Sequence, residues 1–252
     1  MPKFFVKKEQ VNENEIIIIG EDVNHIKNVL RLKAGDRIKI CNIDNSENYL
    51  TEIIKENDTV TCKILEKLES VAEEDIHLHI IQGIPKAEKM ELIIEKCVEL
   101  GVKEITPVVM KSCVVKLDEK AKTKKVLRWQ KISETASKQS GRDMVPKINN
   151  VIVLENIYKL LENYDIVLVA YENEKNNSIK QELIKFKENA TKGQKHELKI
   201  AIIIGPEGGI EEKEVEFLKN NGAHIITLGN RILRTETVAL SVSSVIMYEF
   251  NN

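Results

Sequence analysis

The first 70 residues alternate between short apolar runs and turn sequences, a pattern typical of β-strands. Turn signals separate the runs, most clearly at Ala34–Asp36 and Lys55–Asp58. A short helix is expected at Asp22–Leu30, with one apolar side made of Val23, Ile26, Val29 and Leu30. The pattern predicts a small β-barrel domain over residues 1–70, with strands at Phe4–Val6, Ile16–Ile19, Arg37–Cys41, Tyr49–Ile54 and Thr59–Leu65.

The acidic stretch Glu66–Asp75 is expected to end a strand and to form a linker, after which strands and helices alternate. Strands are predicted at Ile76–Gln82, Glu104–Val109, Ile152–Leu154, Ile166–Ala170, Lys199–Ile204 and Ala223–Leu228. Helices are predicted at Ala87–Leu100, Glu119–Ser140, Ile157–Glu162, Ile179–Lys187, Glu211–Asn220 and Thr235–Phe250. This alternation predicts an α/β domain over residues 75–252, with a parallel sheet covered by helices on both faces.

Composition indicates a soluble, cytoplasmic protein. Apolar residues make up 42% and charged residues 31% of the 252 positions. No apolar run approaches the ~20 residues that cross a bilayer, and the N-terminus shows no signal-peptide pattern. The four cysteines are far apart in the sequence, which favours reduced thiols. His77 and His79 share one face of a strand, but no third ligand is in view, so we expect no metal site.

Charge is distributed unevenly along the chain. The net charge is −2, but residues 111–147 carry 11 Lys and Arg against 4 Asp and Glu, which leaves −9 for the remainder. In the predicted helix Glu119–Ser140 and just beyond it, residues at four- and three-residue spacing form one basic stripe: Lys124, Arg128, Lys131, Thr135, Lys138 and Arg142. Such a stripe is either a solvated helix face or a contact surface for phosphates. A second basic cluster lies in the first domain at Lys27, Arg31, Lys33, Arg37 and Lys39.

A glycine-rich turn follows the apolar strand Lys199–Ile204. Gly205–Gly209 reads Gly-Pro-Glu-Gly-Gly, and a helix begins after it. The turn should lie at the carboxyl edge of the sheet, where open α/β folds bind ligands. It matches neither common phosphate-binding motif, and Glu211 and Glu212 would repel a phosphate at the start of the helix. The turn therefore suits a ligand without phosphates, or it is a tight turn with no ligand.

A second unusual turn follows the strand Ala223–Leu228, where Arg231, Arg234 and Glu236 lie between two apolar elements. Because parallel strands point the same way, this turn, the glycine-rich turn and the end of Ile166–Ala170 should meet at one edge of the sheet. The arginines either form surface ion pairs with Glu236 or Glu207, or lie beside a cofactor and face an anionic substrate.

Several stretches together resemble the RsmE family. They are "HIKNVLRLKAGD", "QGIPKAEKMELIIEKCVELGVKEITPV", "WQKISETASKQSGR", "IIGPEGGIEEKEVE" and "ITLGNRILRTETVAL". The resemblance implies a SPOUT-class RNA methyltransferase that uses S-adenosylmethionine to methylate N3 of a uridine in 16S ribosomal RNA, within the 30S subunit. It also implies a PUA-like RNA-binding β-barrel at residues 1–70, a trefoil-knotted parallel-sheet domain at 75–252, and a homodimer without a membrane partner.

The resemblance also implies roles for individual residues. The cofactor is expected to contact three loops: Ala170, Tyr171, Glu172, Gly205, Pro206, Glu207, Gly208, Gly209, Leu228, Gly229, Arg231, Ile232, Leu233, Thr235 and Thr237. Arg234 is expected to stabilise the uracil anion or position the base, with Glu236 as its orienter or as the general base. The expected RNA contacts are Arg31, Lys33, Lys86, Lys89, Lys124, Arg128, Lys131, Lys138 and Arg142.

Two other functions remain open at this point. One is a SPOUT methyltransferase that acts on a ribose hydroxyl or on tRNA, although "QGIPKAEKM" lacks the asparagine and arginine usual in ribose-methylating relatives. The other is an RNA-binding or ribosome-assembly factor without catalytic activity, which the intact glycine-rich and arginine-rich turns speak against.

Overall fold

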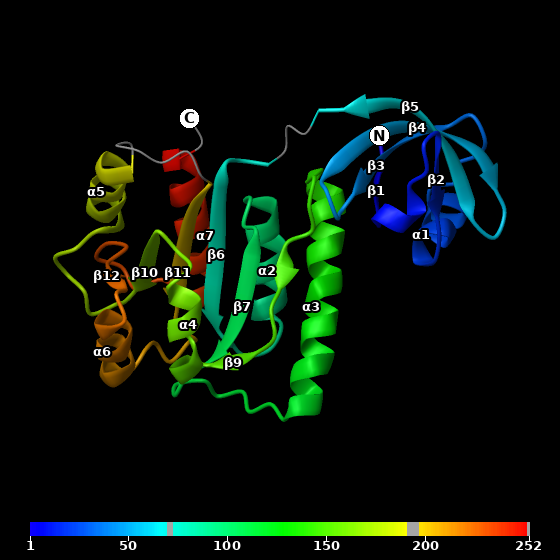
Figure 1. The fold of residues 1–252 in the computed structure, drawn as a ribbon. Helices are drawn as coiled ribbons and strands as arrows, with labels where there is room; N and C mark the ends of the chain where they lie inside the picture. Colours follow the sequence, from blue (N-terminus) through cyan, green and yellow to red (C-terminus); the bar gives the residue numbers. More distant parts are fainter. Residues whose placement is uncertain (70–72, 191–196, 251–252) are drawn as a thin grey trace. The chain divides into compact units, whose positions relative to one another are not determined.

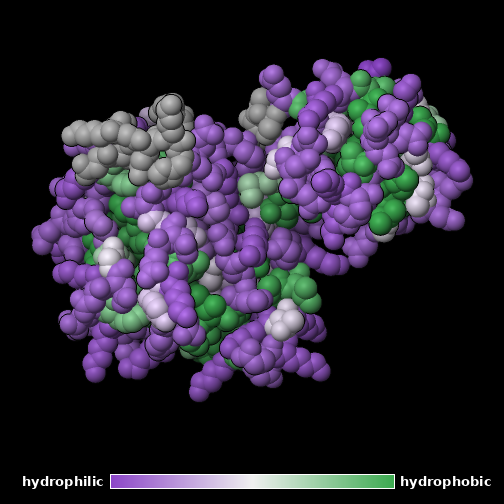
Figure 2. Space-filling view, viewed as in Figure 1, coloured by the Kyte–Doolittle hydropathy of each residue, from purple (hydrophilic) through white to green (hydrophobic). Residues whose placement is uncertain are grey.

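A computed structural model of the chain describes residues 1–69, 73–190 and 197–250. The chain divides into two compact units (Figure 1). The first contains Met1–Glu73 together with Ser137–Val145, and the second contains Glu74–Ala136 and Pro146–Asn252. Hydrophilic side chains cover most of the visible face of each unit, with apolar side chains in smaller patches (Figure 2). Among the described residues, no helix is long and apolar enough to cross a membrane.

The first unit is built on a five-stranded sheet with the strand order β1-β3-β4-β5-β2. The strands are β1 (Lys3–Val6), β2 (Glu15–Ile18), β3 (Arg37–Asn42), β4 (Glu47–Glu56) and β5 (Val60–Leu68). β1 runs parallel to β3 and the other pairs are antiparallel. Apolar side chains that alternate along the strands form the core, among them Phe4, Ile16, Ile38, Ile40 and Ile53. All five predicted strands are therefore confirmed, with ends shifted by a few residues.

The short helix of this unit differs from the prediction. It begins as α1 (Glu21–Asn24) and continues as a π-helical turn at His25–Val29, closed by the bond from Leu30 N to His25 O at 2.9 Å. A π-helical turn rotates successive side chains differently from an α-helix. As a result Ile26 is buried, while Val29 is 63% exposed and Leu30 is 38% exposed. The predicted single apolar face was wrong for these last two residues.

Residues 137–145 join the first unit through ion pairs that the sequence did not indicate. Arg142 Nη2 lies 2.6 Å from Glu73 Oε2, and Lys138 Nζ lies 2.7 Å from Asp22 Oδ1. Lys3 also pairs with Asp143. The buried guanidinium of Arg142 has its charge balanced inside the unit, as a buried charge requires.

The second unit contains a parallel sheet with the order β12-β10-β11-β6-β7-β8, and β9 also pairs with β7. The strands are β6 (Ile76–Gly83), β7 (Glu104–Val109), β8 (Lys147–Ile148), β9 (Ile152–Val153), β10 (Ile166–Ala170), β11 (Leu198–Ile204) and β12 (His224–Ile226). Every described pairing in this sheet is parallel. The predicted parallel sheet is confirmed, whereas the two-residue strand β8 was not predicted.

Helices cover both faces of this sheet, as predicted. The longer helices are α2 (Lys89–Glu99), α3 (Glu119–Ser140), α5 (Ile179–Ala190), α6 (Glu212–Asn220) and α7 (Thr235–Phe250). The predicted helix at Ile157–Glu162 is a 3-10 turn (Leu154–Asn156) followed by the single turn α4 (Tyr158–Leu161). Along β11, Ile200, Ile202 and Ile204 pack in the core beneath α2, α3 and α7, while Ala201 and Ile203 face the core beneath α4 and α6. This alternation explains why a strand buried on both sides is apolar at every position.

A buried polar network links β6, β7 and the segment before β10. His79 is fully buried, with Nε2 at 2.8 Å from Thr106 Oγ1 and Nδ1 against the Tyr164 hydroxyl. Glu104 accepts a hydrogen bond of 2.6 Å from Asn149 and lies 3.1 Å from His77 Nε2. Burial lowers the pKa of His79 from 6.5 to about 4, so this imidazole is neutral in the folded protein at neutral pH.

We predict that the protein loses stability in mild acid through His79. Because the folded-state pKa lies below the unfolded value, the contribution is complete above pH 6.5 and is lost as the pH falls toward 4. The shift corresponds to a loss of about 3 kcal/mol in the free energy of unfolding. Urea unfolding of the wild type and His79→Gln at several pH values tests this. The variant should be less stable at pH 7 but lose less stability between pH 6.5 and 4. Equal pH slopes would contradict the prediction.

Candidate active site

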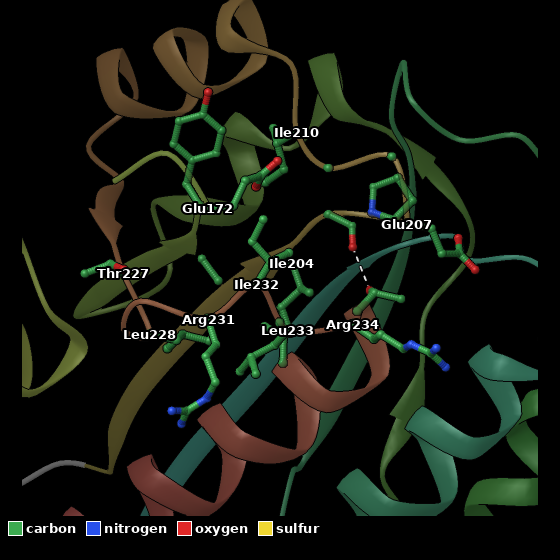
Figure 3. A pocket seen from close by; sticks show the side chains of 18 of the residues that line it. Glu172, Ile204, Glu207, Ile210, Thr227, Leu228, Arg231, Ile232, Leu233 and Arg234 are labelled. Carbon is green, nitrogen blue, oxygen red and sulfur yellow. Dashed lines mark hydrogen bonds between the residues drawn. The ribbon is translucent and has the colours of Figure 1, made fainter. Parts of the chain in front are cut away.

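Three loops meet in one pocket at the carboxyl edge of the sheet, after β10, β11 and β12 (Figure 3). The cavity has a volume of about 460 Å³, within the range of roughly 300–1,000 Å³ typical of small-molecule sites. The loops meet because β10 pairs in parallel with both β11 and β12, so all three strands end at the same edge. The structure therefore brings together the three loops that the sequence analysis expected to meet.

The glycine-rich turn after β11 leaves no room for side chains. A Cβ on Gly205 would lie 2.8 Å from Ile210 Cγ1 and 2.9 Å from the carbonyl carbon of Gly209. A Cβ on Gly208 would lie 2.8 Å from Ser112 Cβ. Gly209 has a φ of +76°, and its N–H donates to Pro206 O at 3.0 Å. Gly205 and Gly208 are therefore required because neighbouring atoms pack closely against them, whereas Gly209 is required by its backbone conformation.

A chain of buried hydrogen bonds joins this turn to the first residue of α7. Gln82 Nε2, on β6, donates to Thr235 Oγ1 at 2.8 Å, and Thr235 Oγ1 donates to Gly205 O at 2.7 Å. All three residues are buried. The two bonds hold the ends of β6 and β11 and the start of α7 in fixed positions around the pocket.

The loop between β12 and α7 presents unpaired backbone groups to the pocket. Among the described residues, the backbone N–H groups of Leu228 and of residues 230–233 have no hydrogen-bond partner. Leu228 and residues 230–233 all line the cavity. Because backbone N–H groups are strong hydrogen-bond donors, this loop is suited to a ligand that carries hydrogen-bond acceptors.

Lys89 carries the positive charge between two carboxylates at the pocket. Its Nζ lies 3.1 Å from Glu207 Oε1 and 3.4 Å from Glu236 Oε2. Glu207 also accepts hydrogen bonds of 3.1 and 3.2 Å from the backbone N–H of Lys86. The hydrogen bond with Glu207 raises the pKa of Lys89. Burial would raise the pKa of Glu207, but hydrogen bonds from its own backbone N–H, Lys89 and Lys86 outweigh this and lower it.

The two arginines of the loop are not paired as the surface ion-pair alternative required. Within the described part of the chain, neither Arg231 nor Arg234 lies in an ion pair, and both are exposed. Figure 3 shows the side chains of Glu207 and Arg234 on one side of the view, with Arg231 directed to the opposite side. Of the two alternatives, the pairing of these arginines with Glu207 or Glu236 was wrong, because Lys89 pairs with both carboxylates.

The structure brings most of the predicted site residues together. Every predicted cofactor contact except Thr237 lines the pocket, as does Arg234, whereas Glu236, 3.4 Å from Lys89 Nζ, does not line it. The sequence analysis did not include several residues that also line the pocket: Lys175, Ile204, Ile210, Thr227, Asn230 and Val238. It assigned Lys89 to RNA. The proximity of Lys89 to residues 207 and 236 depends on the tertiary fold and leaves no local signal in the sequence.

The predicted RNA contacts fall into two groups. Exposed side chains include those of Arg31, Lys33, Lys86, Lys124 and Lys131. Arg128 is exposed but pairs with Glu91 at 2.8 Å. Lys138 and Arg142 are held by Asp22 and Glu73 in the first unit. The stripe on α3 is therefore shorter than predicted, while the opposite side of the helix is buried through Trp129, Ser133 and Ala136.

Comparison with known proteins assigns the chain to a family. Residues 72–247 match a model for an RNA methyltransferase domain, and residues 18–65 match one for an RNA methyltransferase PUA domain. The ribosomal RNA small subunit methyltransferase E of Bacillus subtilis (strain 168) is 35% identical over 252 residues, covering 99% of this chain and 97% of the relative. This chain belongs to the ribosomal RNA small subunit methyltransferase E family. The expected RsmE resemblance, the PUA-like domain and the methyltransferase class are thereby confirmed.

Further relatives agree with this assignment. The protein of the same name from Mesomycoplasma hyopneumoniae (strain 232) is 34% identical, with 95% of this chain and 96% of the relative covered. A crystal structure of the Neisseria gonorrhoeae enzyme bound to S-adenosyl methionine superposes with a TM-score of 0.82 at 26% identity, covering 98% of this chain and 97% of the other.

The pocket fits S-adenosylmethionine on the chemistry of its residues. This cofactor has no phosphate, and the glycine-rich turn lacks the lysine that phosphate-binding loops use. Its adenine edges and amino-acid end need hydrogen-bonding partners, which the unpaired backbone groups of residues 230–233 offer. Gly205 and Gly208 have no room for a side chain, so the turn lines the cavity with its backbone at these positions.

We predict that Gly205→Ala weakens S-adenosylmethionine binding at least tenfold, because the added Cβ meets the backbone of its own turn. Isothermal titration calorimetry measures the affinity. Gly222→Ala is the control: its φ of +86° makes alanine strained, but no atom lies within 4 Å of the new Cβ. The control should lose stability and keep its affinity. Unchanged affinity in Gly205→Ala would show that the turn does not contact the cofactor.

Proposed function

We propose that this protein transfers a methyl group from S-adenosylmethionine to N3 of a specific uridine in 16S ribosomal RNA. The observation that carries the proposal is the pocket itself: a backbone-lined cavity without a phosphate-binding motif, whose lining includes the guanidinium of Arg234, which forms no ion pair with the described residues. Family membership supports the methyltransferase activity, and the names of the relatives support the small-subunit RNA as the substrate class. A ribosomal substrate implies that the protein acts in the cytoplasm.

The proposed chemistry needs positioning and charge stabilisation. When bound, S-adenosylmethionine supplies an electrophilic methyl group on its sulfonium. The residues of the chain must hold the uracil N3 about 3–3.5 Å from that methyl group, after the base has left its neighbours in the RNA. The rigid turn at Gly205 and the hydrogen-bonded start of α7 at Thr235 provide fixed positions for this.

Uracil N3 carries a proton that must leave to solvent water as the methyl group passes from the sulfonium to N3, and the loss of that proton creates negative charge on the base. A guanidinium aimed at developing charge stabilises it more strongly when no carboxylate competes for it. Arg234 forms no ion pair with a carboxylate among the described residues, and we assign it the role of stabilising the uracil anion. Glu236, whose Oε2 lies 3.4 Å from Lys89 Nζ and which does not line the pocket, is assigned the role of orienting Lys89 and not that of general base.

Ribosomal RNA mapped by mass spectrometry tests the proposed function. Deletion of the gene should remove one N3-methyluridine from 16S RNA, and purified protein with labelled cofactor should restore it on small subunits. Arg234→Ala should bind the cofactor normally but methylate on the order of 10²-fold more slowly. Arg231→Ala, whose side chain points to the other side of the pocket, should raise the KM for the cofactor and leave kcat almost unchanged.

Each alternative outcome of this experiment has a defined meaning. Loss of a ribose or tRNA methyl group would identify a different SPOUT activity. A protein that binds no S-adenosylmethionine would be an RNA-binding factor. Wild-type rates from Arg234→Ala would remove the assignment of that arginine.

RNA binding is proposed to use the exposed basic residues of each unit, with Lys124 and Lys131 on α3 as phosphate contacts. Each phosphate contact contributes about 0.7–0.9 to the slope of log affinity against log salt concentration. Lys124→Ala/Lys131→Ala should therefore reduce the slope by about 1.4–1.8 in filter-binding titrations with the 16S substrate. The matched control is Lys180→Ala/Lys213→Ala, which removes two exposed lysines from α5 and α6. Equal slopes for both double variants would argue against contacts along α3.

We also propose that the connection into α7 forms the trefoil knot and that α7 pairs two copies of the chain. α7 contacts α2, β6 and β11 on its inner side, so the last helix returns to the first elements of the unit. On α7, Val245 is 42% exposed and Tyr248 is 79% exposed. Such apolar exposure is typical of a contact surface. Sedimentation velocity of the wild-type protein should show a dimer, and a monomer at assay concentration would contradict this part of the proposal.

A further inference from the structure

One ammonium group lies between the two carboxylates that could otherwise pair with Arg234. Lys89 begins α2, Glu207 lies in the glycine-rich turn after β11, and Glu236 is in the first turn of α7. The Lys89 Nζ is 3.1 Å from Glu207 and 3.4 Å from Glu236. The three side chains are 32%, 25% and 16% exposed, so the cluster is partly shielded from solvent.

Arg234, unlike Lys89, is exposed and forms no ion pair among the described residues. It lines the same pocket as Lys89 and Glu207. Glu236 follows two residues later in the chain, and Figure 3 shows Glu207 and Arg234 on the same side of the view. A flexible arginine near two carboxylates normally pairs with one of them, since guanidinium and carboxylate match in geometry.

We propose that Lys89 is a positioning residue that occupies both Glu207 and Glu236 and thereby keeps the guanidinium of Arg234 available for an anionic substrate. The inference rests on the proposed function for the identity of that substrate. The competition itself does not depend on the proposed function, because it concerns four charged groups of this chain, namely one lysine, one arginine and two carboxylates. Lys86, which is exposed and lies three residues earlier, donates its backbone N–H to Glu207.

The energetic argument follows from the burial of Glu236. Its Oε2 atom is buried and has no hydrogen-bond partner among the described residues, so the ammonium of Lys89 is its charge partner. Removing that ammonium leaves a shielded carboxylate without compensation, which is costly. The neighbouring Arg234 can relieve this cost by turning toward Glu236. The guanidinium would then no longer be available to bind the substrate, although Arg234 itself would be unchanged.

Lys89→Met tests the proposal through the rate of methylation. We expect kcat on small subunits to fall at least tenfold, while affinity for S-adenosylmethionine stays within about threefold of the wild type. Lys96→Met is the matched control, because it removes an equal charge from the same helix, where Lys96 pairs with Glu95 and Glu99, and leaves Glu207 and Glu236 paired with Lys89. It should leave kcat unchanged. Lys89→Arg, which restores a cation, should recover most of the lost rate.

A second variant separates competition from simple loss of a lysine. In Lys89→Met/Glu236→Gln the competing carboxylate is gone, so kcat should recover at least threefold relative to Lys89→Met. If Glu236 were the general base, the double variant would be slower than Lys89→Met, which would overturn the proposal. Equal kcat in Lys89→Met and the wild type would overturn it as well.

Chemical modification of Arg234 gives a readout that is independent of activity. Phenylglyoxal reacts with free guanidinium groups, and peptide mass spectrometry follows each arginine separately. Arg234 should react several-fold more slowly in Lys89→Met than in the wild type and recover in the double variant, while Arg231 should react at the same rate in all three. An unchanged Arg234 rate overturns the inference. Absence of uridine methylation by the wild type would instead overturn the proposed function, so the two failures are distinguishable.

Discussion

The hydrogen bonds from Gln82 to Thr235 and from Thr235 to the carbonyl of Gly205 hold the pocket together. They link three segments that are far apart in the chain and that each end at the carboxyl edge of the sheet. Because the groups are buried, an unmade bond would cost more than a made bond contributes. The turn around Gly205 and the helix that begins at Thr235 therefore cannot move independently. The loop between β12 and α7 connects to this fixed point, which explains how its unpaired backbone groups can form a defined surface without bonds of their own.

Three of the charged groups at the pocket are paired with one another. Two carboxylates, Glu207 and Glu236, share the ammonium of Lys89. The backbone N–H of Lys86 also donates to Glu207, so this carboxylate is stabilised without an arginine. The arginines of the loop then remain exposed in a region where ion pairing would be expected. Under the proposed function, paired carboxylates and exposed guanidinium groups suit a pocket that holds an uncharged adenine and an anionic base.

The opposite end of the sheet contains a different polar arrangement. His79, Thr106, Tyr164 and Glu104 satisfy each other across β6, β7 and the segment before β10. These groups lie near the amino ends of the strands, away from the loops that line the pocket. The network fixes the pairing of strands whose apolar side chains alone would permit other arrangements, because any other register would leave a buried imidazole unpaired.

The sequence by itself determined the elements and the place of the site. Long helices with clear periodicity, Glu119–Ser140 and Thr235–Phe250, begin and end where predicted, since apolar spacing and capping are local properties. The glycine-rich turn and the arginine-bearing turn were recognisable because parallel strands must end together. Only the tertiary structure decided which charges meet. Lys89 reaches Glu207 and Glu236, and Arg142 reaches Glu73, through folding that brings distant segments together. Spacing along a helix predicts which side chains share a face, but not which carboxylate from another element will face them.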